Sequence, residues 1–286
     1  MDVAVEIKKY NNSLFKEKVN RIYFADAFCQ YLIPDKKELE KTYKTAKDNE
    51  IQFTLNTPYV TDAGIKHLLE NIELIYKYEE TFEVVFNDWG VFYEVKKRFP
   101  KIKQILGRLL TKQRTDPNSY AIITNSQKTS HENGVTIKKV PETLRDLILM
   151  YKYTLYKHFQ SSVINDNIFQ DFLIENNINR VEIEYLAWDM DLRLPDAVKA
   201  SVYYPYAHIT TTRNCGLLNM TYSACNKMCN EIIIKYDGED MLFPYYAVGN
   251  TVYYKVKDMA KLGQYRCIDR IVFNDLEAFH NFGEIK

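Results

Sequence analysis

Cysteine is the residue type whose spacing in this chain most clearly suggests chemistry. The 286-residue sequence contains five cysteines, and Cys215, Cys225 and Cys229 follow one another in the pattern C-x9-C-x3-C. Thiolates bind zinc and iron–sulfur clusters, and both kinds of site commonly use four ligands. Three buried small hydrophobic residues or free thiols are the alternative, which so dense a cluster in a cysteine-poor chain disfavours. We therefore predict a metal or iron–sulfur site on a cysteine loop at 213–230.

A fourth ligand must come from elsewhere in the chain, and the two remaining cysteines are the candidates. Cys29 follows a predicted strand at 21–25, as Cys215 follows a predicted strand at 208–212. In a parallel barrel the carboxyl ends of the strands gather at one end, so these two residues could meet there. Cys267 precedes a late apolar run and is more easily interpreted as a buried thiol. We predict Cys29 as the fourth ligand.

The first half of the chain alternates predicted strands and helices in units of about 30 residues, which is typical of repeated βα units. Helices are predicted to begin near Asp35, Thr61 and Asp88, because these residue types cap helices and apolar residues follow at helical spacing. Four such units within the first part of the chain match the spacing of strands and helices in a (β/α) barrel. Their strands are predicted at 21–25, 51–55, 82–86 and 102–106. The predicted fold class is α/β, a TIM-like (β/α) barrel, either complete or incomplete and distorted, forming one domain over 1–286.

The alternation of predicted strands and helices becomes less regular after this half. Turn-forming residues between short β-prone runs at 120–124 and 135–139 predict an irregular excursion or hairpin around 117–140. Helices are then predicted at 141–159 and 169–175. A strand at 181–186 places Glu182 and Glu184 on one face. Further strands, which could complete the barrel, are predicted at 200–206, 208–212, 231–236 and 251–256.

Composition excludes several classes of protein. The 38 basic and 38 acidic residues balance, so overall charge indicates no nucleic-acid or membrane partner. No apolar run is long enough to cross a bilayer, and the charged N-terminal segment does not resemble a secretion signal. We expect a cytoplasmic protein without a membrane span, in which an odd number of cysteines does not indicate a disulfide framework.

Several short segments follow one another in the order seen in a known family. They are Asn87-Asp-Trp-Gly90, Leu106-Gly-Arg-Leu-Leu110 with Lys112-Gln113 and Asp116-Pro117, and Tyr204-Pro-Tyr206 before Thr210-Thr-Thr-Arg-Asn-Cys215. The chain resembles the collagenase-like peptidase family U-thirty-two in these segments. Within that family it most resembles the UbiV-type iron–sulfur branch.

This resemblance implies a small barrel that holds a 4Fe-4S cluster and acts in oxygen-independent hydroxylation. The substrate would be of the ubiquinone type or an RNA, and the partner would be a UbiU-like family member in a heterodimer. The family pattern of one early cysteine and a later trio corresponds here to Cys29, Cys215, Cys225 and Cys229, although the gap of nine residues after Cys215 is shorter than in that pattern. A zinc-stabilised binding or scaffold module is the alternative. A peptidase is disfavoured because the sequence has neither a nucleophile elbow nor an HExxH helix.

Polar residues just past predicted barrel strands are candidates for the surroundings of the site, because such positions face the active-site end of a barrel. Each has a structural alternative: Asp88 could cap its helix, Asn56 could serve a turn, and Arg108 could pair with a carboxylate. Arg213, beside Cys215, could instead raise the potential of a cluster. The basic run 112–114 could contact RNA, but a solvated loop is the favoured interpretation. The candidate catalytic residues are Asn56, Asp88, Arg108, Glu184 and Arg213.

Overall fold

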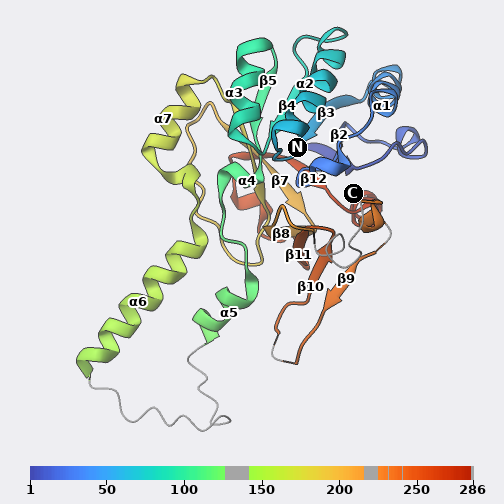
Figure 1. Cartoon of the computed structure of the whole chain (residues 1–286). Coiled ribbons are helices and arrows are strands. Elements are labelled where there is room, and N and C mark those ends of the chain that lie inside the picture. Colours follow the sequence, from blue (N-terminus) through green and yellow to red (C-terminus); the bar gives the residue numbers. More distant parts are fainter. Residues whose placement is uncertain (126–141, 216–224, 231, 240, 285–286) are drawn as a thin grey trace.

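Eight parallel strands close into a barrel in the computed structural model, which describes residues 1–125, 142–215, 225–230, 232–239 and 241–284 (Figure 1). The order around the barrel is β1-β12-β7-β6-β5-β4-β3-β2. This confirms the predicted α/β, TIM-like barrel, and the barrel is closed rather than incomplete. Its strands are β1 (Asp2–Ile7), β2 (Arg21–Phe24), β3 (Gln52–Thr57), β4 (Glu83–Phe86), β5 (Lys103–Leu106), β6 (Arg180–Glu184), β7 (Lys199–Tyr204) and β12 (Ile268–Phe273).

Alternating residues of β1 show how the strands divide the core. Val3 and Val5 belong to the large apolar core that includes residues of the surrounding helices, whereas Ala4 packs with Tyr23 and Tyr203 in a separate cluster drawn from six strands. Period-two alternation therefore separates an outer, helix-covered layer from the barrel interior. The strand β1 was absent from the predicted elements, although its sequence DVAVEI carries this alternation.

Helices surround the barrel as the βα pattern predicts. Asp35 accepts a hydrogen bond from the backbone N–H of Glu38 at the start of α1, and Asp88 accepts two, from Gly90 and Val91, at the start of α3. Both residues thus cap their helices as predicted. The helices of this half are α1 (Lys36–Asp48), α2 (Asp62–Tyr76) and α3 (Trp89–Arg98).

The excursion between β5 and β6 is helical where it is described, so the predicted strand at 120–124 is wrong. Pro117 occupies the first position of α5, and the Asp116 carboxylate accepts hydrogen bonds from the backbone N–H of Asn118 and from the hydroxyl of Ser119. These start signals outweigh the β propensity of the isoleucines that follow. The run at 135–139 lies outside the described residues. The helices here are α4 (Arg108–Thr111), α5 (Pro117–Asn125), α6 (Glu142–Gln160) and α7 (Asn167–Glu175); the last two confirm predictions, and α6 extends away from the barrel (Figure 1).

A second, antiparallel sheet is inserted between β7 and β12, in the order β8-β11-β10-β9. The strands predicted at 208–212, 231–236 and 251–256 fall in this sheet and not in the barrel. The barrel is instead completed by β12, which was not predicted and which pairs with both β1 and β7. The elements are β8 (Tyr206–Thr211), β9 (Ile234–Tyr236), β10 (Tyr245–Val248) and β11 (Thr251–Lys255), and α9 (Leu276–Glu284) follows β12.

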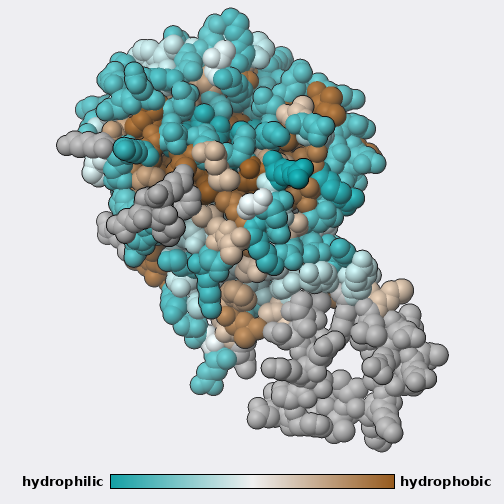
Figure 2. All heavy atoms as spheres, turned by 180° about the vertical axis from the view of Figure 1, so that it is seen from behind, coloured by the Kyte–Doolittle hydropathy of each residue, from teal (hydrophilic) through white to brown (hydrophobic). Residues whose placement is uncertain are grey.

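Surface hydropathy differs between regions of the molecule. Seen from behind, hydrophilic residues cover most of the upper part, where α1 to α3 lie, and apolar residues form a band across the middle (Figure 2). Among the described helices, none combines the length and the apolar character that a membrane span requires.

Candidate metal centre and adjoining cavity

Four cysteines from distant parts of the sequence line one small cavity. Cys29 follows β2, Cys215 follows β8, and Cys225 and Cys229 precede β9, with Cys229 in the short 3-10 helix η4 (Met228–Asn230). The cavity has a volume of about 20 Å³ and is also lined by residues that follow β1 and by the turn between β10 and β11. The four predicted ligands are therefore brought to the same end of the barrel, where the carboxyl ends of its strands lie.

Asp26 fixes the loop that carries Cys29. One oxygen of its buried carboxylate accepts hydrogen bonds from the backbone N–H groups of Phe28 and Cys29, both at 2.8 Å. The other oxygen lies 2.6 Å from the Lys8 ammonium. The backbone amides of Tyr31 and Leu32 lower the pKa of the Cys29 thiol, against the larger effect of burial. Amide donors of this kind stabilise a ligating thiolate and tune the potential of an iron–sulfur centre.

The tight turn Gly249-Asn250 joins the other cysteine segments to this loop. Asn250 Nδ2 lies 2.9 Å from the carbonyl oxygen of Phe28 and 2.9 Å from that of Thr212, so one amide bridges the segments before Cys29 and Cys215. Gly249 has a φ of +62°, and a Cβ added there would lie 2.9 Å from Cys229 Cβ. A glycine is thus required for the backbone to approach Cys229 so closely. The turn was not identified from the sequence, although Gly-Asn between two β-prone runs is a hairpin signal.

The donor set fits a four-thiolate site. Burial, together with the Asp26 charge, raises the pKa of the Cys29 thiol to about 11, and burial also raises that of Cys229. Such thiols are protonated at neutral pH until a metal displaces the proton. In the described part of the chain, no three His, Cys, Asp or Glu side chains form a group that could hold a single metal ion. The four thiols share a cavity, but they do not close around one point.

Arg108 occupies the barrel mouth next to this centre and is buried. Its guanidinium lies 3.3 Å from a carboxylate oxygen of Glu6 and 3.3 Å from one of Glu184. It also lies over the rings of Tyr203, at 3.5 Å from the centroid, and Phe28, at 4.6 Å. The pairing with carboxylates that was the structural alternative is therefore present, and in these contacts Arg108 orders the mouth of the barrel.

Burial governs the protonation of the groups around Arg108. Burial raises the pKa of Glu184 to about 7, against the opposing charge of Arg108, and raises that of Glu6 as well. Burial and the same arginine lower the pKa of His208 to about 3, so its ring is neutral. The ring stacks on Phe28 at a centroid distance of 4.5 Å. His208 therefore packs against the site as an uncharged aromatic ring.

The other predicted polar residues have different environments. Asn56 lies within β3 rather than in a turn, and its Nδ2 donates to Glu6 Oε1 at 2.8 Å, which places it at the barrel mouth beside the Arg108 pair. Asp88 caps α3. Arg213 is exposed and lies 5.4 Å from the Tyr59 ring centroid, in a cavity that Cys29 and Cys215 also line.

Cys267 lies apart from this centre. It directly precedes β12, at the amino end of a barrel strand, and its carbonyl oxygen accepts a hydrogen bond from Ala200. It packs, half-buried, against the large apolar core. The prediction that left it out of the ligand set agrees with this position.

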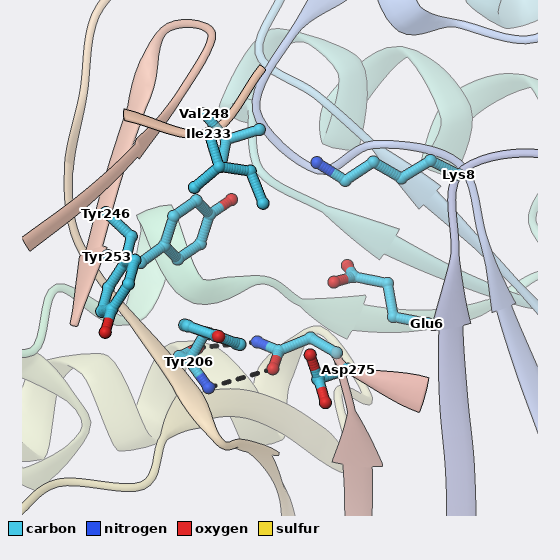
Figure 3. A pocket seen from close by; sticks show the side chains of 9 residues that line it. Glu6, Lys8, Tyr206, Ile233, Tyr246, Val248, Tyr253 and Asp275 are labelled. Atoms are coloured by element: carbon cyan, nitrogen blue, oxygen red, sulfur yellow. Dashed lines mark hydrogen bonds between the residues drawn. The ribbon is translucent and has the colours of Figure 1, made fainter. Parts of the chain in front are cut away.

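A larger cavity, of about 270 Å³, adjoins the cysteine cavity and shares Lys8 and Val248 with it. Figure 3 shows the Glu6 and Lys8 side chains entering this space from the end of β1, while tyrosine side chains of the antiparallel sheet line the opposite side. Sequence reasoning missed this cavity. Its lining residues lie at the end of β1 or just after it, follow β12, or lie in or next to the antiparallel sheet; β1 and β12 are the two barrel strands that were not predicted. They include Glu6, Lys8, Tyr206, Tyr246, Tyr253 and Asp275.

Comparisons with known proteins add little. No protein-family model matches the chain. No curated protein matches it either. One solved structure, described as a novel glycoside hydrolase family 18 N-acetylglucosaminidase from Paenibacillus barengoltzii, covers 95% of this chain and 94% of its own at 7% identity, with a TM-score of 0.31. A similarity this low supports no statement about activity.

Proposed function

We propose that this chain is an iron–sulfur protein that binds a 4Fe-4S cluster through Cys29, Cys215, Cys225 and Cys229. One observation carries the proposal: thiols from three separate segments line the same cavity at the carboxyl end of the barrel. The residues around the cavity support it further, because the backbone amides of Tyr31 and Leu32 favour the Cys29 thiolate and the Lys8 ammonium also lines the cavity. When bound, the cluster would supply electron transfer.

Zinc is the alternative occupant of a site with four thiolates. A structural zinc ion would need all four sulfurs about 2.3 Å from one point. The described residues form no such group. In a 4Fe-4S cluster each thiolate binds a different iron, so the four sulfurs stand farther apart. The cluster is proposed over zinc because the resemblance to the UbiV-type branch implies it, and metal analysis decides between the two.

We further propose that the protein is a subunit of an oxygen-independent hydroxylation system with a UbiU-like partner as a heterodimer. The resemblance to the UbiV-type branch of family U-thirty-two supports this role and suggests a ubiquinone-type or RNA substrate. The adjoining cavity shares two wall residues with the cysteine cavity, so a molecule bound there would lie beside the cluster. In this role Asp26 and Lys8 hold the wall between the two spaces, and Glu6 and Asn56 present polar atoms at the barrel mouth.

Metal analysis of protein purified strictly without oxygen tests the proposal. We expect about four irons and about four acid-labile sulfides per chain, with a visible absorption that dithionite bleaches. Zinc should be present only in trace amounts. One zinc per chain, with no iron after the same anaerobic handling, would favour a zinc-stabilised scaffold module and would contradict the redox role.

A further inference from the structure

The cavity beside the cysteine centre has aromatic walls. Tyr206, Tyr246 and Tyr253 come from three strands of the antiparallel sheet, and the rings of the first two meet edge to face at a centroid distance of 5.5 Å. Figure 3 shows these side chains on one side of the space, with Glu6 and Lys8 entering from the other. The face of a tyrosine ring is electron-rich and attracts an organic cation.

The cations at this cavity already have carboxyl partners. Lys8 is the cation in its lining, and Asp26 already neutralises it at 2.6 Å. Behind the wall, Arg108 is shared between the carboxylates of Glu6 and Glu184. Lys8 and Arg108 therefore already pair with three carboxyl groups, those of Asp26, Glu6 and Glu184, before any ligand binds.

Asp275 adds a fourth carboxylate to this balance. It lies in the cavity wall just before α9, where one of its oxygens accepts a hydrogen bond of 2.8 Å from the backbone N–H of Ala278. Within the described residues Asp275 forms no ion pair with a lysine or arginine. Its neighbour Asn274 is held by two hydrogen bonds with the backbone of Tyr206, so the position of Asp275 relative to the tyrosine wall is fixed.

We propose that this cavity binds a small organic cation, an amine or ammonium compound whose charged head lies between the carboxylates of Asp275 and Glu6 and the tyrosine rings. The apolar part of such a ligand would lie against Ile233 and Val248, which complete the lining. An anionic ligand, including an RNA phosphate, would face the Asp275 carboxylate, which pairs with no lysine or arginine among the described residues. This ligand goes beyond the proposed redox function and is distinct from a ubiquinone-type or RNA substrate, and its binding does not need the cluster.

Three probes of similar size that differ in charge test the proposal on the full chain: benzylamine, benzyl alcohol and benzoate, titrated by calorimetry at pH 7. We expect benzylamine to bind at least about tenfold more tightly than benzyl alcohol, which corresponds to about 1.4 kcal/mol, and benzoate to bind most weakly. Binding of benzyl alcohol or benzoate as tight as that of benzylamine would overturn the proposal.

Matched variants locate the effect. Asp275→Asn should abolish most of the preference for benzylamine while keeping α9, because asparagine caps a helix about as well as aspartate. Asp166→Asn is the control, since Asp166 caps α7 in the same way outside this cavity. Tyr246→Phe should retain the preference and Tyr246→Leu should weaken it. A preference that survives in Asp275→Asn would contradict the assignment.

Iron and sulfide analysis of the same samples separates the two proposals. Protein that binds benzylamine selectively but contains no cluster would refute the redox function and keep the cation site. Protein with a full cluster and no selectivity among the probes would refute the cation site alone.

Discussion

Replacing Arg108 with methionine is expected to lower the free energy of unfolding by about 3–5 kcal/mol, the range found when one partner of a buried ion pair is removed. Only 2% of the Arg108 side chain is exposed, and it serves both Glu6 and Glu184. Methionine can replace the aliphatic stem but provides no donor or charge. Two buried carboxylates would then remain without their cation.

The loss should depend on pH in a defined direction. The pKa of Glu184 is about 7 in the folded protein, above its ordinary value of 4.5, because burial outweighs Arg108. A raised folded pKa contributes stability below the unfolded pKa and loses it as the pH rises through the folded pKa. Without Arg108 the folded pKa would rise further, so the deficit of Arg108→Met should be larger at pH 8 than at pH 5.

Chemical denaturation followed by circular dichroism, at both pH values, measures this effect. Arg98→Met is the control: Arg98 forms an exposed ion pair with Glu94 on α3 and should change the free energy of unfolding by less than about 0.5 kcal/mol. Equal small losses in both variants would show that Arg108 does not hold the barrel mouth together.

Gly249→Ala is expected to weaken cluster binding without removing any ligand. The φ of +62° at this turn is unfavourable for alanine by about 1–2 kcal/mol. The added methyl group would also lie 2.9 Å from Cys229 Cβ and 3.3 Å from its sulfur, so the Cys229 segment or the turn must move. A shift of 1–2 kcal/mol against the ligating arrangement lowers the ratio of loaded to empty protein by roughly 5- to 30-fold.

Iron bound per chain after anaerobic reconstitution at limiting iron and sulfide provides the measurement. Gly263→Ala is the matched control, because a Cβ there meets nothing within 4 Å. The control should load as the unmodified protein does. Normal loading of Gly249→Ala, with unchanged folding, would mean that Cys229 does not need its present position to bind the cluster.

Much of the barrel could be predicted from the sequence because its βα units are specified by residues close together in the chain. Capping by Asp35 and Asp88 and the apolar runs of β2 to β5 follow from residues close together in the chain. The segment 120–124 was wrongly predicted as a strand because its isoleucines occur in both strands and helices. The capping contacts of Asp116 favour the helix. Strand β1 was missed although its alternation was readable.

The candidate site was predictable only in part. Cys29 was predicted near Cys215 because both were taken to follow barrel strands, but only Cys29 does; β8, the strand before Cys215, belongs to the antiparallel sheet. The contacts of Arg108 could not be foreseen, since Glu6 and Glu184 lie 102 and 76 residues away in the chain. The aromatic cavity depends on the pairing of β8 with β11, which joins residues 40 to 49 positions apart, and no local pattern specifies that pairing.

A comparison of two single-cysteine variants tests the central claim most directly. Cys29→Ala removes a proposed ligand, whereas Cys267→Ala removes a thiol of similar burial at the other end of the barrel. Iron and acid-labile sulfide per chain, with the electron paramagnetic resonance signal of dithionite-reduced protein, should show an intact four-iron cluster in Cys267→Ala and its loss or conversion in Cys29→Ala. An unchanged cluster in Cys29→Ala, or its loss in Cys267→Ala, would contradict the assignment of the four ligands.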